Sequence, residues 1–294
     1  MTTRWDHPEI ARWEELGRYR HLAGHRVFTI DLPPAVDSEL EPLLIIHGYP
    51  TSSFDYAALA PELSHRRRVV LVDLLGYGLS DKPDLEYTLA LQADVVVALT
   101  TELGIDRLAL LTHDMGDTVG GELLARQIEG SWPVEVTRRV VTNGSIYIEM
   151  ANLTAGQQFL LSLPDERLPG NGPDRDSLAA SLVATLAPAA AGSDLAAHAE
   201  LIVHLGGSTM LGRTIRYIEE RRANERRFTG AIETHPSPLH IVWGPLDPIA
   251  VAPMADRLRA ARPDATLSWI DGAGHYPQLE APAAFLAAVT EVLG

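Results

Sequence analysis

The stretch "LTHDMGD", Leu111–Asp117, decides the fold of this chain. It directly follows the apolar run "RLAL" and directly precedes the run "TVGGELLARQIEG", residues 118–130. A short apolar run predicts a strand, whereas apolar residues spaced three and four apart predict a helix. The chain must therefore pass from strand to helix within one tight turn, and Asp114 lies at the centre of that turn.

The same alternation of strand and helix continues along most of the chain. Aliphatic and β-branched runs predict strands at residues 25–31, 42–48, 67–76, 107–114, 138–146, 238–247 and 265–275. Amphipathic runs predict helices at residues 88–104, 118–130, 251–263 and 281–293. Strands that alternate with helices form a mostly parallel sheet with helices on its faces. The sequence therefore predicts an α/β fold with a mostly parallel central sheet flanked by helices.

Residues 147–235 interrupt this alternation. The segment is rich in Ala and Leu, contains the loop "LPGNGPDRDS", and has no strand-length run bounded by turns. It separates the strands expected at 138–146 and 238–247, and open α/β sheets bind ligands beyond the carboxyl ends of their strands. We therefore expect a core made of residues 1–146 and 236–294, with residues 147–235 forming a helical cap above the binding site.

The composition excludes several classes of function. With 294 residues, 46% of them hydrophobic, the chain can bury one large core or a core with a cap. Its formal charge of −15 at pH 7 argues against nucleic acids and anionic membranes as partners, because both require a positive protein face. The absence of cysteine excludes disulfides and thiolate sites.

The sequence also predicts a cytoplasmic location. The apolar runs are too short to cross a bilayer. The first ten residues, "MTTRWDHPEI", lack the basic start and apolar centre of a secretion signal. Neither a membrane nor a nucleic acid is therefore expected as a partner.

The stretch "YIEERRANERRF", residues 217–228, concentrates arginine in this acidic chain. Its glutamates alternate with the arginines at helical spacing, which favours pairs of opposite charge on one helix. We expect a solvent-exposed helix face with paired charges and no nucleic-acid surface.

Asp114 lies where a turn can project one side chain from the end of a strand. Small neighbours such as Gly116 allow the helix to begin close by, so that the next backbone N–H points toward the projecting group. The N–H groups at the start of the helix would keep a carboxylate ionised. Thr112 departs from the pattern, because the first small position of such turns is usually glycine. Asp114 could instead be an ordinary N-cap, a frequent role for Asp.

Two other strand ends carry residues that suit acid–base chemistry. Asp247 follows the expected strand in "IVWGPLDPIAV", and His275 lies in the glycine-rich loop of "SWIDGAGHYPQLEAP". An Asp before Pro is usually a turn former, and a lone loop histidine is usually solvated. The order Asp114, Asp247, His275 is nevertheless the order of nucleophile, acid and histidine in one large class of hydrolases.

Five segments together resemble the α/β-hydrolase superfamily. They are "HGYPTSSFDY", "DLLGYGLSDKP", "LTHDMGD", "WGPLDP" and "GHYPQLEAP". Within the superfamily they are similar to the branch of epoxide hydrolases and haloalkane dehalogenases, which use an aspartate nucleophile. More narrowly, "HDMGDTVGGELLAR", "YIEERR", "GPLDP" and "HYPQLE" resemble bacterial relatives of the mesoderm-specific transcript protein. The similarity extends through nearly the whole core and the end of the cap.

The resemblance implies a covalent mechanism without cofactor or metal. An aspartate is already an anion at neutral pH, so Asp114 can displace a leaving group from an sp³ carbon and form an alkyl ester. His275, oriented by Asp247, would then activate the water that hydrolyses this ester. The backbone N–H groups of Tyr49 and Met115 would form the oxyanion hole.

The expected substrate is a small apolar electrophile, either an epoxide or an alkyl halide. Haloalkane dehalogenases commonly bind halide with Trp or Asn side chains at the positions of Met115 and Tyr49, and neither of these offers an N–H in its side chain. An epoxide needs a proton donor, and Tyr217 matches the second cap tyrosine of epoxide hydrolases. Tyr147 or, less directly, His204 could supply the second donor.

Epoxide hydrolysis through Asp114 is therefore the leading hypothesis, and other functions remain open. A haloalkane dehalogenase, or a mixed activity, would need unusual halide donors. A serine-type esterase is disfavoured because the turn has no hydroxyl at position 114. A binding or regulatory protein could keep the fold without turnover. The sequence carries no interface signature that predicts an oligomeric state.

Overall fold

The central sheet of the computed structural model, which describes residues 4–294, has eight strands in the order β1-β2-β4-β3-β5-β6-β7-β8. The pairs β1–β2 and β2–β4 are antiparallel, and all other neighbours are parallel. The strands are β1 (Gly17–Leu22), β2 (His25–Leu32), β3 (Leu43–Ile46), β4 (Val69–Val72), β5 (Arg107–His113), β6 (Glu135–Thr142), β7 (Leu239–Trp243) and β8 (Thr266–Trp269). The predicted mostly parallel sheet is confirmed.

The strands β3 and β4 are wholly apolar because helices cover both faces of the sheet. Every residue of β3, β4 and β7 is buried. The seven strands expected from the sequence are all present. The strand β1, which the sequence did not predict, is a half-exposed edge strand with the polar sequence "GRYRHL", and it lacks the apolar run that marks the others.

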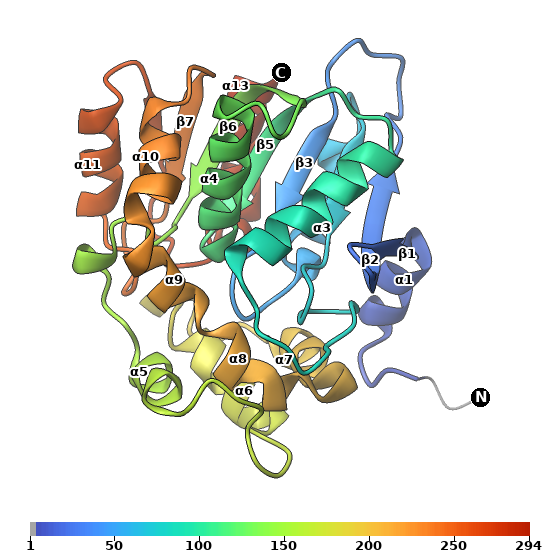
Figure 1. Cartoon of the computed structure of the whole chain (residues 1–294), viewed down its shortest axis with the longest axis vertical. Helices are drawn as coiled ribbons and strands as arrows, with labels where there is room; N and C mark the ends of the chain where they lie inside the picture. The colour runs from blue at the N-terminus through green and yellow to red at the C-terminus, as the bar shows by residue number, and fades with distance from the viewer. Residues whose placement is uncertain (1–3) are drawn as a thin grey trace.

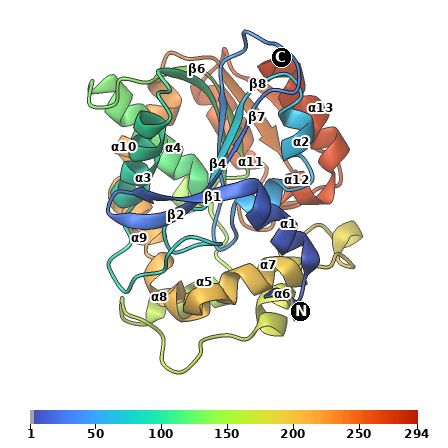
Figure 2. The same ribbon diagram turned by 90° about the vertical axis from the view of Figure 1, so that its right-hand side faces the viewer.

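Helices cover the two faces of the sheet (Figures 1 and 2). On one face lie α3 (Leu89–Glu102), α4 (Met115–Ile128) and α10 (Glu225–Thr234); on the other lie α2 (Ala60–Leu63) and α13 (Pro282–Leu293). The remaining core helices are α1 (Pro8–Leu16), α11 (Pro253–Ala261), α12 (Pro277–Glu280) and the 3-10 turn η1 (Ser53–Tyr56). The helices expected from the amphipathic runs are therefore confirmed.

The segment between β6 and β7 is described throughout and contains helices but no strand. Its elements are η2 (Ile148–Met150), α5 (Ala155–Ser162), α6 (Arg175–Val183), η3 (Pro188–Ala190), α7 (Ala196–Val203), η4 (His204–Met210), α8 (Leu211–Thr214), α9 (Tyr217–Ala223) and α10. The helices α5 to α8 form a layer beyond one end of the sheet, while α10 returns to lie beside α4 (Figure 1). The boundaries 147–235 of a separate cap domain stay a prediction.

The length and hydropathy of the helices within residues 4–294 show whether any of them could span a membrane. None of them combines the length and the apolar character needed to cross a bilayer.

Candidate active site

The turn between β5 and α4 holds Asp114 in an unusual backbone conformation. Its φ of 50° and ψ of −114° lie where residues other than glycine are strained, and its side chain does not cap α4. Asp114 therefore occupies the N-cap position of α4 without the side-chain hydrogen bond of an ordinary capping Asp. Close packing explains Gly116, since a Cβ there would lie 2.4 Å from the carbonyl oxygen of Ile46. The turn thus projects a buried carboxylate at the carboxyl end of the sheet.

Thr112, the departure from the usual pattern, is accommodated by the helix that follows. Helix α4 presents Gly120 to it, and a Cβ on Gly120 would lie only 3.0 Å from Cγ2 of Thr112. The hydroxyl of Thr112 also donates to Asp117, a buried residue of the first turn of α4. Gly120 of the helix therefore provides the space that a glycine at position 112 of the strand would usually provide. The Thr112 hydroxyl has Asp117 as its hydrogen-bond partner.

The sheet places Tyr49 beside Asp114. Strand β3 pairs in parallel with β5, with Ile46 opposite Thr112, so the loops after both strands leave the sheet side by side. The backbone N–H of Tyr49 donates to Oδ2 of Asp114 at 2.9 Å. Met115 is the first residue of α4, so its N–H has no acceptor within the helix. The two N–H groups expected to form an oxyanion hole thus flank the carboxylate.

Asp247 and His275, predicted from separate strand ends, meet in the fold. Oδ2 of Asp247 lies 2.8 Å from Nδ1 of His275. The other oxygen, Oδ1, accepts from the N–H groups of Ile249 and Ala250 at 2.7 and 3.0 Å. The carboxylate is therefore fixed by its own loop, and it leaves Nε2 of His275 free to exchange a proton.

Asn143 completes this arrangement, and sequence reasoning missed it. Its Nδ2 donates to Oδ2 of Asp247 at 2.8 Å, and its Oδ1 accepts from the N–H of Gly244 at 2.9 Å. Asn143 follows β6 directly and has a φ of 46°. The only sequence signal was an Asn-Gly pair after a strand, which also marks ordinary turns.

The electrostatics of the site centre on His275. Burial by itself lowers the pKa of its imidazole, but the charge and hydrogen bond of Asp247 and the charge of Asp114 outweigh burial and raise the pKa to about 9. His275 is therefore an imidazolium at neutral pH in the resting protein. It lies between two carboxylates, so its protonation depends on the charge of each.

This dependence can be measured with an Asp114→Asn variant. Removing one of the two negative charges should lower the pKa of His275 from about 9, because the charged imidazole loses part of its stabilisation. A titration of the His275 ring nitrogens by ¹⁵N NMR in both proteins would show the shift. An unchanged pKa in the variant would mean that Asp114 does not act on the imidazole.

His113 supports the histidine loop from behind the turn. Its Nε2 lies 2.8 Å from the carbonyl oxygen of His275, and its ring packs against the rings of His275 and Tyr276. Burial and the neighbouring His275 lower the pKa of His113 to about 4, so its ring is neutral. A neutral ring can donate its Nε2 proton to that carbonyl and hold the loop in place.

Four tyrosine rings gather near Asp114. The Tyr217 ring lies 5.5 Å from the Tyr49 ring, and the Tyr77 ring lies 6.4 Å from it. Burial, and then the charge of Asp114, raise the pKa values of the Tyr49 and Tyr217 phenols. Both phenols therefore keep their protons. Tyr276 is the fourth, and its hydroxyl lies 3.3 Å from the Tyr49 carbonyl oxygen.

The side chains of Tyr147 and His204, expected as possible second proton donors, have other partners in the structure. The hydroxyl of Tyr147 donates to Glu233 at 2.6 Å, and its ring packs under the guanidinium of Arg257. The ring of His204 packs on Trp5 at 4.6 Å, near the amino-terminal segment. Neither residue lines the cavity that Tyr49 and His275 line. The packing of the helices in this segment turns both side chains toward these other partners.

The arginine-rich stretch also differs from the expected exposed face. Arg221 is only 1% exposed. Its Nε donates to the hydroxyl of Thr118 on α4 at 2.7 Å, and its Nη1 donates to the carbonyl oxygen of Ser145 at 3.0 Å. Arg221 also lies 5.0 Å from the centre of the Tyr217 ring. It therefore ties α9 to the helix that begins at the active-site turn.

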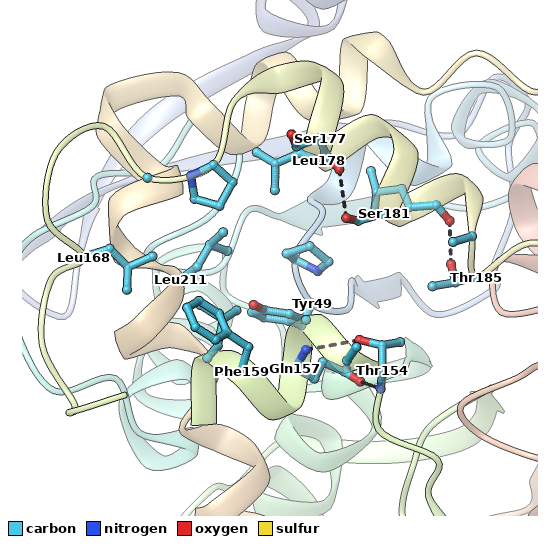
Figure 3. Close-up of a pocket in the computed structure, with 18 of the residues that line it drawn as sticks. Tyr49, Thr154, Gln157, Phe159, Leu168, Ser177, Leu178, Ser181, Thr185 and Leu211 are labelled. Atoms are coloured by element: carbon cyan, nitrogen blue, oxygen red, sulfur yellow. Dashed lines mark hydrogen bonds between the residues drawn. The ribbon is translucent and has the colours of Figure 1, made fainter. Parts of the chain in front are cut away.

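A cavity of about 800 Å³ is lined by Tyr49, which donates to Asp114, and by His275, while Asp114 itself is not among its lining residues (Figure 3). Tyr49, His275 and Tyr276 line it on the side of the core, and residues of α5 and α6 line it on the other side. Tyr217 does not line this cavity; it lines a small neighbouring void with Met115. The tyrosine rings that line the cavity are those of Tyr49 and Tyr276, and sequence reasoning had assigned a side-chain role to neither of them.

Comparisons with known proteins agree with this geometry. A family model described as the alpha/beta hydrolase family matches residues 43–289. LipZ of Mycobacterium tuberculosis, which is named as a hydrolase, is 35% identical over 97% of this chain and 98% of its own length. The mesoderm-specific transcript protein of Mus musculus is 33% identical, over 95% of this chain and 86% of its own. A solved alpha/beta hydrolase fold protein from Burkholderia ambifaria superimposes with a TM-score of 0.73, at 26% identity, over 94% of this chain and 97% of its own.

Proposed function

The chain is a hydrolase that belongs to the alpha/beta hydrolase family, and we propose that it opens epoxides to vicinal diols through an ester on Asp114. The observation that carries the proposal is the position of the Asp114 carboxylate. It occupies the turn where this family holds its nucleophile, with Oδ2 on the N–H of Tyr49 and with an Asp247–His275 pair beside it.

In the first half of the reaction, Oδ1 of Asp114 attacks an epoxide carbon. A bond forms between that carbon and Oδ1, the carbon–oxygen bond of the ring breaks, and its electron pair goes to the epoxide oxygen. The phenol of Tyr217, with Tyr49 as its neighbour, gives its proton to this oxygen. Oδ2 is the oxygen that remains on the Tyr49 N–H, so Oδ1 is the one available to attack.

The second half hydrolyses the ester with water. Esterification neutralises Asp114, which removes one of the charges that raise the pKa of His275. The imidazole can then lose its proton and take one from the water that attacks the ester carbonyl carbon. The N–H groups of Tyr49 and Met115 hold the oxyanion that forms on Oδ2. Collapse of this intermediate breaks the bond between the carboxyl carbon and Oδ1, and the imidazolium of His275 gives its proton to Oδ1, which leaves with the diol. The carboxyl group of Asp114, which now holds the oxygen from water, loses its remaining proton to solvent and is a carboxylate again.

One set of assays distinguishes the proposed function from the alternatives. Purified protein should convert epoxides such as styrene oxide to diols, with little halide release from 1-bromobutane and little hydrolysis of p-nitrophenyl acetate. Halide release without diol formation would instead assign a haloalkane dehalogenase. Rapid ester hydrolysis that survives in an Asp114→Ala variant would assign an esterase that works by another nucleophile. Binding of these compounds without any turnover would assign a binding or regulatory protein.

The proton donor can be tested by removing single hydroxyls. A Tyr217→Phe variant should form the Asp114 ester about 100-fold more slowly, because general acid catalysis contributes roughly 10² to 10⁴ in rate. Rapid quenching followed by peptide mass spectrometry measures this step directly. Tyr147→Phe is the matched control, since its hydroxyl bonds to Glu233 outside the cavity. If Tyr49→Phe slows the step and Tyr217→Phe does not, Tyr49 is the donor.

A further inference from the structure

The cavity lined by Tyr49 and His275 is large for a substrate that consists of little more than an epoxide ring. Its volume of about 800 Å³ lies in the upper part of the range of roughly 300–1,000 Å³ that holds drug-sized ligands. It extends from His275 and Tyr49 across the inner sides of α5 and α6 (Figure 3). A small epoxide such as propylene oxide would leave most of this volume unused.

The wall that faces the reacting groups is apolar. Leucine side chains come to it from α5, α6, α8 and the loop before α6, and they are Leu160, Leu163, Leu168, Leu178, Leu182 and Leu211. Apolar groups bind in proportion to the apolar area that they remove from water. The wall therefore favours the binding of substrates that carry a hydrocarbon portion away from the epoxide.

Two hydroxyls along the wall, those of Ser181 and Thr185, hydrogen-bond to carbonyl oxygens three or four residues earlier in the chain. Ser181 donates to the carbonyl oxygen of Ser177 at 2.8 Å, and Thr185 donates to that of Leu182 at 2.7 Å. Thr154 and Gln157 bond reciprocally at the start of α5 (Figure 3). These groups have already found partners, whereas the side chains of Asn171 and Ser177, which also line the cavity, are neutral groups that can hydrogen-bond to a ligand.

Compensating charge is also missing from the wall. Within residues 4–294, the residues that line the cavity include no Asp, Glu, Lys or Arg. His275 lines it, and its Nδ1 is hydrogen-bonded to Asp247. Among the lining residues the His275 imidazolium is the one cation, and it is already paired with Asp247, so a carboxylate buried between α5 and α6 would have no cation of its own to replace its hydration. The net charge of −15 further disfavours an anion.

The mouth of the cavity is apolar as well. Phe159 lines the cavity and is 62% exposed, so it forms part of the rim. No residue of α5 is buried, although the helix carries Phe159, Leu160 and Leu161 in sequence. A hydrocarbon chain can therefore meet apolar side chains from the surface to the interior.

We propose that the site selects neutral, lipophilic epoxides of drug-like size and rejects the same skeleton when it carries a carboxylate. The proposal rests on the proposed function, because the reacting group is taken to be an epoxide. It adds a discrimination that the catalytic residues do not explain, since Asp114, Asp247 and His275 would treat an acid and its ester alike.

The decisive comparison uses one skeleton in two charge states. The methyl ester of cis-9,10-epoxyoctadecanoic acid should show a kcat/KM at least about 100-fold higher than the free acid at pH 7.5, because an unpaired buried carboxylate is strongly disfavoured. Equal values, or a preference for the acid, would overturn the proposal. Propylene oxide should be a poor substrate relative to the ester, and a kcat/KM equal to that of the ester would also overturn it.

A charge placed on the wall should shift this preference. In a Ser181→Arg variant, the ratio of ester to acid should fall about fivefold, as expected for an ion pair at a partly exposed site. Ser162→Arg is the matched control, since Ser162 is an exposed serine of α5 that does not line the cavity. The same fall in both variants would mean that overall charge, and not the wall, sets the selectivity.

Binding to an Asp114→Asn variant separates this proposal from the proposed function. If the variant binds the ester more tightly than the acid, while the wild type hydrolyses neither, the selectivity of the cavity stands and the epoxide chemistry fails. If the wild type hydrolyses both at similar rates, the epoxide chemistry stands and the selectivity fails. If neither compound binds or reacts, both fail.

Discussion

A His275→Ala variant mixed with a reactive epoxide should accumulate a stable ester on Asp114. The nucleophile and the oxyanion hole do not involve this side chain, so the first half of the reaction can proceed. The second half lacks the base that takes a proton from water. Steady-state turnover should fall by at least about 10⁴-fold, as removal of a residue that acts as part of a catalytic unit typically causes. Peptide mass spectrometry should find the mass of the epoxide added at Asp114.

The wild-type protein provides the control for this experiment. Under identical conditions its Asp114 peptide should carry little adduct, because His275 clears the ester. The Asp247–His275 contact at 2.8 Å adds a graded test, since Asp247→Asn should slow hydrolysis of the ester more than its formation. If the Asp114 peptide of the His275→Ala variant stays unmodified, while the wild type hydrolyses the same epoxide, the covalent mechanism is wrong.

Replacement of the nucleophile should have an effect of the same size without any adduct. An Asp114→Asn variant keeps an oxygen for the N–H of Tyr49 but loses the anion that attacks carbon. Diol formation should fall by at least about 10⁴-fold. Asp114→Ala checks that slow deamidation of the asparagine does not restore activity. Turnover that persists in both variants would move the nucleophile elsewhere.

Asp117 offers a matched control three residues away. It is also a buried carboxyl of this turn, and burial raises its pKa well above the usual range. Its oxygen accepts from Thr112, so it supports the packing of β5 against α4. An Asp117→Asn variant that folds, as judged by circular dichroism, should keep diol formation within about tenfold of the wild type. A loss equal to that of Asp114→Asn would contradict the assignment.

The sequence was informative where the chemistry depends on strand ends. Asp114, Asp247 and His275 each follow an apolar run that forms a strand, and parallel strands bring their carboxyl ends to one edge. Local patterns therefore place these residues on one side of the sheet before any contact is known. The Asp247–His275 pair then follows from the adjacency of β7 and β8.

The sequence was uninformative where a role depends on packing between distant elements. Asn143 bonds to residues of two other loops, and no local pattern distinguishes it from a turn asparagine. Arg221 and Arg222 are adjacent and alike in sequence, yet only Arg221 is buried, because the position of α9 against α4 decides which one faces inward. Packing between distant elements also sets the partners of Tyr147 and His204, which no local pattern indicates.

The backbone of Asp114 sets thermal stability against the activity that we propose for this protein. A residue other than glycine at a φ of 50° and a ψ of −114° costs about 1–3 kcal/mol of folding free energy. Glycine would adopt the same conformation without that cost. Selection for heat resistance alone would therefore act against the carboxylate, and engineering campaigns on this chain need to hold position 114 fixed while they stabilise the rest.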